Sequence, residues 1–117
     1  MAELRQYFTA NNRSPYGLWF SELDAIAATK VVTALSRLEA GNTSNVDAVG
    51  EGVSELKIDF GPGYRVYFGW DGSELVILLG GGTKKRQSSD IKKAKGYWDD
   101  YKTRKREARK KAAQRCH

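Results

Sequence analysis

Alternation of apolar and polar positions is clearest between residues 52 and 85, where it predicts strands joined by turns. Residues 53–60 alternate with period two, as a strand with one buried face does. Gly61-Pro62-Gly63 interrupts the alternation, and residues 64–68 resume it with aromatic and β-branched side chains. The pattern therefore predicts two strands separated by a tight turn.

A third strand is predicted after a short hairpin. Asp71-Gly72 between apolar runs is a strong hairpin signal. Residues 75–79 form a continuous apolar run, which is typical of the centre of a sheet. We expect the glycines 80–82 to end this strand in a sharp turn, where their N–H groups could meet an anion.

Helical spacing replaces alternation in residues 16–40. Apolar residues recur every three or four positions, at Leu18, Trp19, Leu23, Ile26, Ala27, Val31, Ala34, Leu35 and Leu38. Ser14-Pro15 favours a helix start, Asp24 can cap a second helix, and Gly41 is a good left-handed stop. We expect two short helices, at about 16–23 and 24–40.

The remaining segments complete an α+β fold. Residues 3–9 alternate and predict an edge strand, whereas residues 41–51 are polar and turn-like. Ser88 or Ser89 is expected to cap a third helix. That helix carries one apolar face for the sheet, formed by Ile91, Ala94, Trp98 and Tyr101. The predicted order is an N-terminal strand, two helices, a three-stranded antiparallel meander and a C-terminal helix.

Charge is divided unevenly along the 117 residues. Residues 1–83 contain six Lys/Arg and ten Asp/Glu, a net charge of −4, whereas residues 84–117 contain fourteen and four, a net charge of +10. This split favours a nucleic-acid or ribosomal partner, or an acidic protein. Positions 102–115 carry no apolar side chain larger than alanine. We therefore expect residues 102–117 to form a fraying helical extension that tunes affinity and performs no chemistry.

Composition bounds the remaining possibilities. The length suits one domain, which we place at residues 1–101, with residues 102–117 as a basic extension. No run of 18 apolar residues predicts a membrane span, and the first residues lack a secretory pattern. The single cysteine, Cys116, cannot form an internal disulfide, so a cytoplasmic location is expected.

Three stretches resemble the RelE/ParE superfamily of toxins from bacterial toxin–antitoxin modules. They are residues 49–58 (VGEGVSELKI), 61–68 (GPGYRVYF) and 78–84 (LLGGGTK), with Gln87 and Asp90-Ile91 following. Within the superfamily, the chain is most similar to the putative addiction-module killer proteins, related to HigB and to phage Gp49-like proteins. The likeness covers about residues 16–100 and excludes the basic extension.

This resemblance implies a small toxin neutralised by a partner, which we expect to be a helix-turn-helix-type antitoxin. Many relatives cut mRNA on the ribosome, so the leading hypothesis is a ribosome-dependent, metal-independent endoribonuclease that needs no cofactor. ParE-like relatives poison DNA gyrase instead, and fold alone does not separate the two. A protein that only binds its antitoxin is a third possibility.

Arg65, Lys57 and Lys84 are the candidate catalytic residues. RNA cleavage without a metal needs a base, a cation for the phosphate and an acid for the leaving oxygen. Arg65 can grip a phosphate bidentately, and the resemblance places an active-site arginine there. Lys57 lies where ribonuclease relatives carry a catalytic lysine, and Lys84 is the third cation. The alternative for Arg65 is an ion pair with Glu55 or Asp59.

Aromatic and further basic residues are candidates for RNA binding, namely Tyr67, Lys85, Arg86 and Lys92. Strand alternation places Tyr67 on the face of Arg65, where it is expected to stack on a base, and leaves Tyr64 for the core. Glu55 shares the face of Lys57 and could serve as a base. The only histidine is His117, at the terminus, so no general acid is identified. No residues have metal-ligand spacing.

Overall fold

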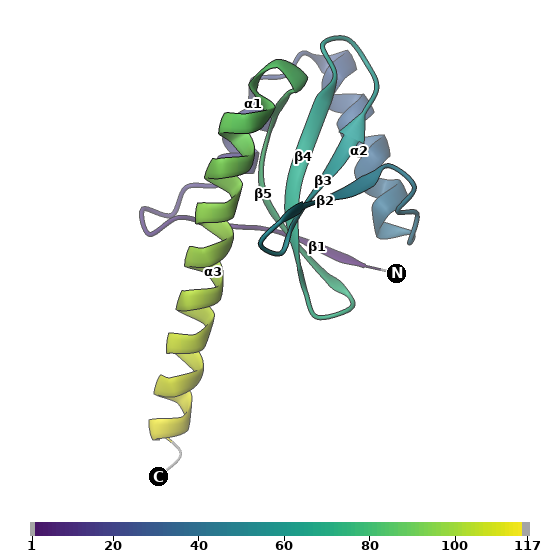
Figure 1. Ribbon diagram of the computed structural model, residues 1–117. Coiled ribbons are helices and arrows are strands. Elements are labelled where there is room, and N and C mark those ends of the chain that lie inside the picture. The colour runs from purple at the N-terminus through teal and green to yellow at the C-terminus, as the bar shows by residue number, and fades with distance from the viewer. Residues whose placement is uncertain (1, 116–117) are drawn as a thin grey trace.

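A computed structural model describes residues 2–115 and confirms the α+β class. The fold consists of three helices and a five-stranded mixed sheet (Figure 1). The elements are β1 (Glu3–Gln6), α1 (Pro15–Ser21), α2 (Ala25–Glu39), β2 (Val46–Gly50), β3 (Val53–Ile58), β4 (Tyr64–Asp71), β5 (Leu75–Thr83), the 3-10 turn η1 (Lys84–Arg86) and α3 (Gln87–Arg115). Within the described residues, no helix is both long and apolar enough to cross a membrane.

The sheet has the order β1-β5-β4-β3-β2, with β1 parallel to β5 and the other neighbours antiparallel. The predicted meander is therefore confirmed as β3–β4–β5. The prediction of a turn-like segment at 41–51 is wrong, because Val46–Gly50 pairs with β3 as an edge strand. Only Val46 and Val49 are half-buried in β2. Backbone pairing therefore stabilises this strand, and its side-chain pattern gives little indication of it.

Strand β5 continues through the glycines 80–82 to Thr83, so the predicted turn at these glycines is wrong. A bulge opposite Tyr67 and Phe68 places Leu79 and Gly80 on the same face of the sheet. A Cβ on Gly81 would lie 2.3 Å from the ring of Trp19, and one on Gly82 would lie 1.9 Å from Asp90 Oδ2. The missing side chains thus admit neighbouring residues on both faces.

Helix ends follow the sequence signals for α1 and α2. The Ser14 hydroxyl accepts a hydrogen bond from Gly17 N–H at 2.9 Å, and Pro15 opens the helix. The Asp24 carboxylate accepts from Ala27 N–H at 2.8 Å and starts α2, which ends before Gly41 with φ at +99°. The predicted pair of helices and their caps is confirmed.

The sheet has an apolar core on each face. Helices α1 and α2 cover one face, where Tyr16, Val31 and Leu38 pack on side chains of β3, β4 and β5. Helix α3 covers the other face, where Ala94 and Trp98 pack on strand residues that include Tyr67 (Figure 1). Residues Ile91, Ala94, Trp98 and Tyr101 face the sheet as predicted.

Helix α3 begins at Gln87, directly after η1, so neither Ser88 nor Ser89 caps it and that prediction is wrong. The helix also continues to Arg115 and projects beyond the sheet (Figure 1). Its emergence from the globule is fixed by polar contacts, because the Asp71 carboxylate accepts a hydrogen bond from Tyr101 at 2.6 Å and from Lys105 at 2.5 Å. The hydrogen bond from Lys105 lowers the pKa of Asp71 most, and that from Tyr101 lowers it further. Burial raises the pKa of Tyr101 to about 12.

The adjacent glycines of β5 give a matched test of this packing. Gly81→Ala is expected to lower the free energy of unfolding by about 1–3 kcal/mol, because the new methyl group overlaps Trp19. Gly80→Ala meets open space at an ordinary φ and is expected to leave stability unchanged or raise it by about 0.5 kcal/mol. Urea unfolding of both variants measures the difference; equal stabilities would contradict the assigned packing of Trp19.

Candidate functional site

Three predicted catalytic residues meet at one corner of the sheet. Lys57 on β3 lies directly opposite Arg65 on β4, and Arg65 lies opposite Gly82 on β5. Residues opposite one another in a sheet project from the same face, which here is the face covered by α3. Lys84 directly follows β5, and its N–H donates to the carbonyl of Gly63 at 2.7 Å. The structure therefore gathers these three cations from separate strand ends.

Glu55 holds Arg65 from the buried side. The Arg65 Nε atom lies 3.4 Å from Glu55 Oε2, and the side chains are 12% and 5% exposed. The geometry is that of an ion pair without a well-formed hydrogen bond, since Nε has no hydrogen-bond partner among the described residues. Gln87 Nε2 donates to both oxygens of the Glu55 carboxylate, at 3.1 and 3.0 Å. Glu55 is thus occupied as a positioning group and is poorly exposed for a base.

The far end of the Arg65 side chain faces the turn between β3 and β4. A Cβ built on Gly63 would lie 3.8 Å from Arg65 Nη1 and 3.4 Å from the Cβ of Lys84. Gly63 has φ at +78° and carries no side chain between these two residues. The guanidinium therefore pairs with Glu55 through Nε, while Nη1 and the Cβ of Lys84 both lie beside Gly63.

Lys57 lies on the exposed side of this corner. Its ammonium pairs with the Asp47 carboxylate of β2 at 2.6 Å, and the two side chains are 45% and 56% exposed. An exposed ion pair contributes little stability and is readily exchanged. An RNA phosphate that binds Lys57 would have to replace Asp47.

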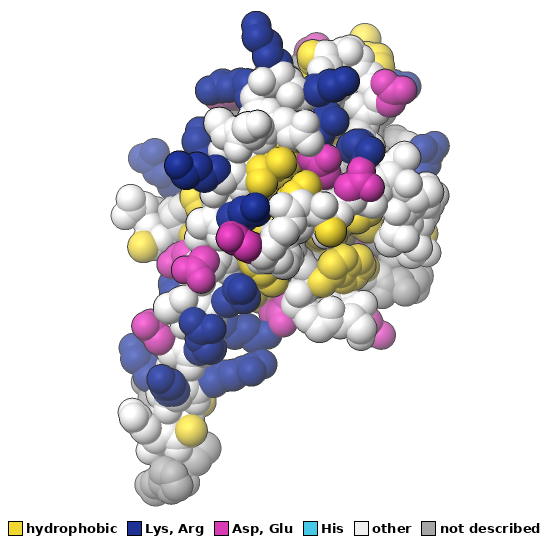
Figure 2. All heavy atoms as spheres, in the orientation of Figure 1, with side chains coloured by type: hydrophobic (Ala, Val, Ile, Leu, Met, Phe, Trp, Pro, Cys, Tyr) yellow, Lys and Arg dark blue, Asp and Glu magenta, His cyan; other side chains and the backbone are white. Residues whose placement is uncertain are grey.

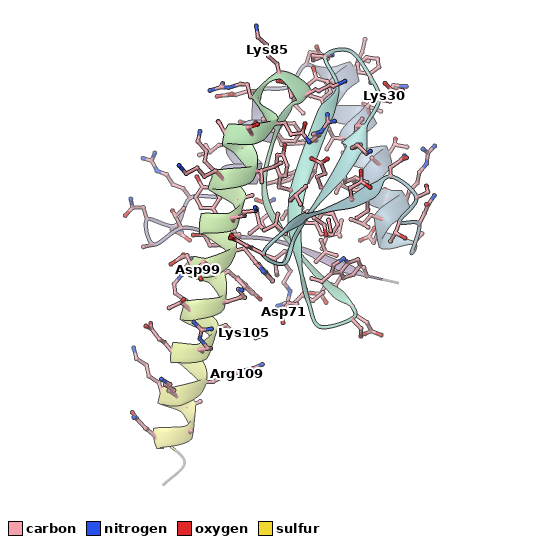
Figure 3. The ribbon with its side chains drawn as sticks, in the orientation of Figure 1. Lys30, Asp71, Lys85, Asp99, Lys105 and Arg109 are labelled. Carbon is pink, nitrogen blue, oxygen red and sulfur yellow. The ribbon has the colours of Figure 1, made fainter. Side chains whose placement is uncertain are left out.

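Further cations surround the corner. Lys85 and Arg86 are exposed on η1, and Lys92 is exposed on the first turns of α3. In Figure 2, dark blue side chains gather over the start of α3 and again over its projecting end. Lys85 extends away from the protein surface in Figure 3. These three predicted RNA-binding residues are therefore open to solvent beside Lys84.

Tyr67 is buried, whereas the predicted base-stacking role requires an exposed ring. Its side chain is fully buried between the sheet and α3, so its ring presents no face to a base in this conformation. Burial, followed by the nearby Glu55 and Asp90 carboxylates, raises the pKa of its hydroxyl. Tyr64 packs edge-on against Trp19, on the opposite face of the sheet, as the alternation predicts.

No proton donor for a leaving oxygen stands out at the corner. Residues 2–115 contain no histidine, and His117 lies outside the described residues. Across the described part of the chain, no three His, Cys, Asp or Glu residues are grouped so that they could hold a metal ion. The corner offers three cations, Arg65, Lys57 and Lys84, which can stabilise negative charge.

Sequence reasoning did not identify Gln87 and Asp90 as parts of this region's polar network. Gln87 hydrogen-bonds Glu55, and Asp90 fills the space above Gly82. Burial raises the pKa of Asp90, while Lys93 and Arg86 oppose that shift. Their spacing of three residues, one helical turn, is the signal that places both on the sheet-facing side of α3.

Comparison with known proteins identifies the family of this chain. Residues 18–115 match the family described as phage derived protein Gp49-like (DUF891). The chain belongs to the Gp49-like family. This family is part of the RelE/ParE-like toxin superfamily, and such a toxin-like family implies an antitoxin partner in general.

A similar protein occurs in Haemophilus influenzae. It is 45% identical over 78 residues, which is 66% of this chain and 79% of that protein. It is described as an uncharacterised protein, so the similarity indicates no activity.

Proposed function

We propose that this Gp49-like protein is the toxin of a type II toxin–antitoxin module and a ribosome-dependent mRNA endoribonuclease. The convergence of Arg65, Lys57 and Lys84 at one corner of the sheet carries this proposal. In RNA cleavage the 2′-oxygen loses its proton to solvent and attacks the adjacent phosphorus, and the bond to the 5′-oxygen of the next nucleotide breaks, with that oxygen taking a proton from solvent. This adds negative charge to the phosphate oxygens in the transition state. Fixed cations at that position lower the barrier.

Each cation has a separate role in this proposal. Arg65 grips the scissile phosphate through its Nη atoms, because Glu55 occupies the Nε side. Lys57 leaves Asp47 to bind a phosphate oxygen, and Lys84 binds from the end of β5. Lys85, Arg86 and Lys92 hold neighbouring phosphates of mRNA or ribosomal RNA. The antitoxin, which we expect to contain a helix-turn-helix, blocks access to these cations.

Induction of the protein in bacterial cells is expected to stop growth, with incorporation of labelled amino acids falling before DNA synthesis does. Co-expression of the helix-turn-helix-type antitoxin should restore both. Normal growth with abundant folded protein would contradict toxin function. An initial fall in DNA synthesis would instead favour inhibition of gyrase and contradict the ribosomal target.

A further inference from the structure

A cavity of about 460 Å³ lies next to the cationic corner and has no role in the chemistry described above. The loop between β1 and α1, with the start of α1, forms one side of it, and α3 forms the other. Its floor comes from β4 and β5, at Tyr67, Leu79 and Gly80. We refer to this cavity as the loop–helix pocket.

Tyr67 gives the floor a polar atom without a partner. Tyr67 lines the pocket, and its hydroxyl is fully buried and makes no hydrogen bond with any residue that the structure describes. A buried hydroxyl without a hydrogen-bond partner is energetically unfavourable, and buried hydroxyl groups in proteins normally have one. A ligand edge would supply one once the side chains that cover this hydroxyl move aside.

Gly80 gives the floor a flat, open area. It lies opposite Tyr67 in the ladder, and a Cβ placed on it would meet nothing within 4 Å. By contrast, Trp19 and Asp90 occupy the corresponding space at Gly81 and Gly82. Tyr97 adds half-buried apolar surface beside this opening, over the buried Leu79 and Ala94, which suits a planar ring.

The pocket walls combine two cations with one carboxyl group. Arg13 from the loop and Lys93 from α3 both line the pocket. Asp90 lines it as well; burial raises the pKa of its carboxyl group, whereas Lys93 and Arg86 oppose that shift. Asn11 and Thr9 supply further donors and acceptors at the loop side.

We propose that the loop–helix pocket binds one nucleotide, with its base on Gly80, a base edge hydrogen-bonded to the Tyr67 hydroxyl, and its phosphate between Arg13 and Lys93. An apolar, flat floor with one buried polar group and two cations matches the three parts of a nucleotide. Tyr67 lies two residues from Arg65 on the same face, about 7 Å along the strand. The nucleotide in question is either free or part of an RNA chain, and the second case rests on the proposed endoribonuclease function.

Binding is tested by titrating the full chain with each nucleoside 5′-monophosphate, with short oligoribonucleotides and with inorganic phosphate, followed by NMR chemical shifts. Saturable shifts with a monophosphate are expected, and tighter binding of an oligoribonucleotide would assign the pocket to RNA. Equal affinity for inorganic phosphate, or no saturable shift up to about 10 mM nucleotide, would overturn the proposal.

Two variants locate the binding. Gly80→Leu is expected to fill the floor and weaken nucleotide binding at least about 10-fold, whereas Gly96→Ala, on an open position of α3, should bind as the parent does. Tyr67→Phe should weaken binding about 3- to 10-fold while leaving the melting temperature unchanged or slightly raised, because no internal hydrogen bond is lost. Parental affinity in both pocket variants would contradict the assignment.

Failure of this inference is separable from failure of the proposed function. A variant lacking Arg65 should still bind the monophosphate if the pocket is correctly assigned, even when growth arrest is lost. Loss of monophosphate binding in a folded Arg65 variant would place the nucleotide at the cationic corner and overturn the pocket assignment.

Discussion

Replacing Arg65 by glutamine together with Glu55 by glutamine is expected to abolish growth arrest and to lower RNA cleavage by roughly 10²–10³-fold. Arg65 is the only one of the three clustered cations that is held by a buried partner, and so has a fixed orientation before substrate arrives. Loss of this charge removes the group best placed to stabilise the transferring phosphate. Lys57→Ala and Lys84→Ala should have the same effect in weaker form, since both side chains are exposed.

The paired substitution separates chemistry from stability. Arg65→Ala alone would leave the Glu55 carboxylate buried with Gln87 as its remaining partner, at a cost of about 3 kcal/mol in unfolding free energy. Replacing both charges avoids an isolated buried carboxylate. Glu55→Gln alone, and Arg37→Gln on α2, are the matched controls. Cleavage at the parental rate by a folded double variant would refute the role of Arg65.

Removing residues 106–117 is expected to weaken binding to ribosomes or RNA and to flatten its salt dependence, with thermal stability nearly unchanged. The described residues 106–114 are exposed, and five cations are removed, at positions 106, 109, 110, 111 and 115. Each phosphate contact contributes about 0.7–0.9 to the log–log salt slope, so the slope should fall by about 3.5 to 4.5 if all five bind. Affinity measured between 50 and 300 mM salt tests this expectation.

Truncation after Tyr101 is the matched comparison and removes structural contacts as well. Lys105 hydrogen-bonds Asp71, and Arg104 donates to the carbonyl of Phe8 and pairs with Asp100 (Lys105 and Asp71 are labelled in Figure 3). The shorter chain should therefore melt several degrees below the chain cut after Lys105. An unchanged salt slope together with a large fall in melting temperature, for the cut after Lys105, would show that the projecting helix is structural.

Local signals in the sequence account for most of the fold. Ser14-Pro15, Asp24 and Gly41 act through backbone chemistry within a few residues, so the bounds of α1 and α2 follow from them. The strand β2 depends on pairing with β3 across the sheet, and its own residues are mostly polar and exposed. A strand held chiefly by a neighbour's backbone leaves little trace in its own hydrophobic pattern.

The glycines 80–82 show why part of the site was also missed. Glycine most often marks a turn, and the local pattern predicts one. Here the glycines remain in β5, because Trp19 and Asp90 come from distant parts of the chain to occupy the space beside two of them. Alternation correctly places Arg65 and Tyr67 on one face, but it cannot show that α3 covers Tyr67 and leaves Lys84 exposed.

The most direct test of the proposed activity adds purified protein to a reconstituted translation reaction and maps the 5′ ends of the mRNA. New ends inside translated codons are predicted, dependent on ribosomes and absent with the Glu55→Gln/Arg65→Gln variant. A parallel reaction with gyrase and supercoiled plasmid serves as the comparison. Intact mRNA on translating ribosomes, with gyrase-linked DNA breaks in the parallel reaction, would contradict the endoribonuclease.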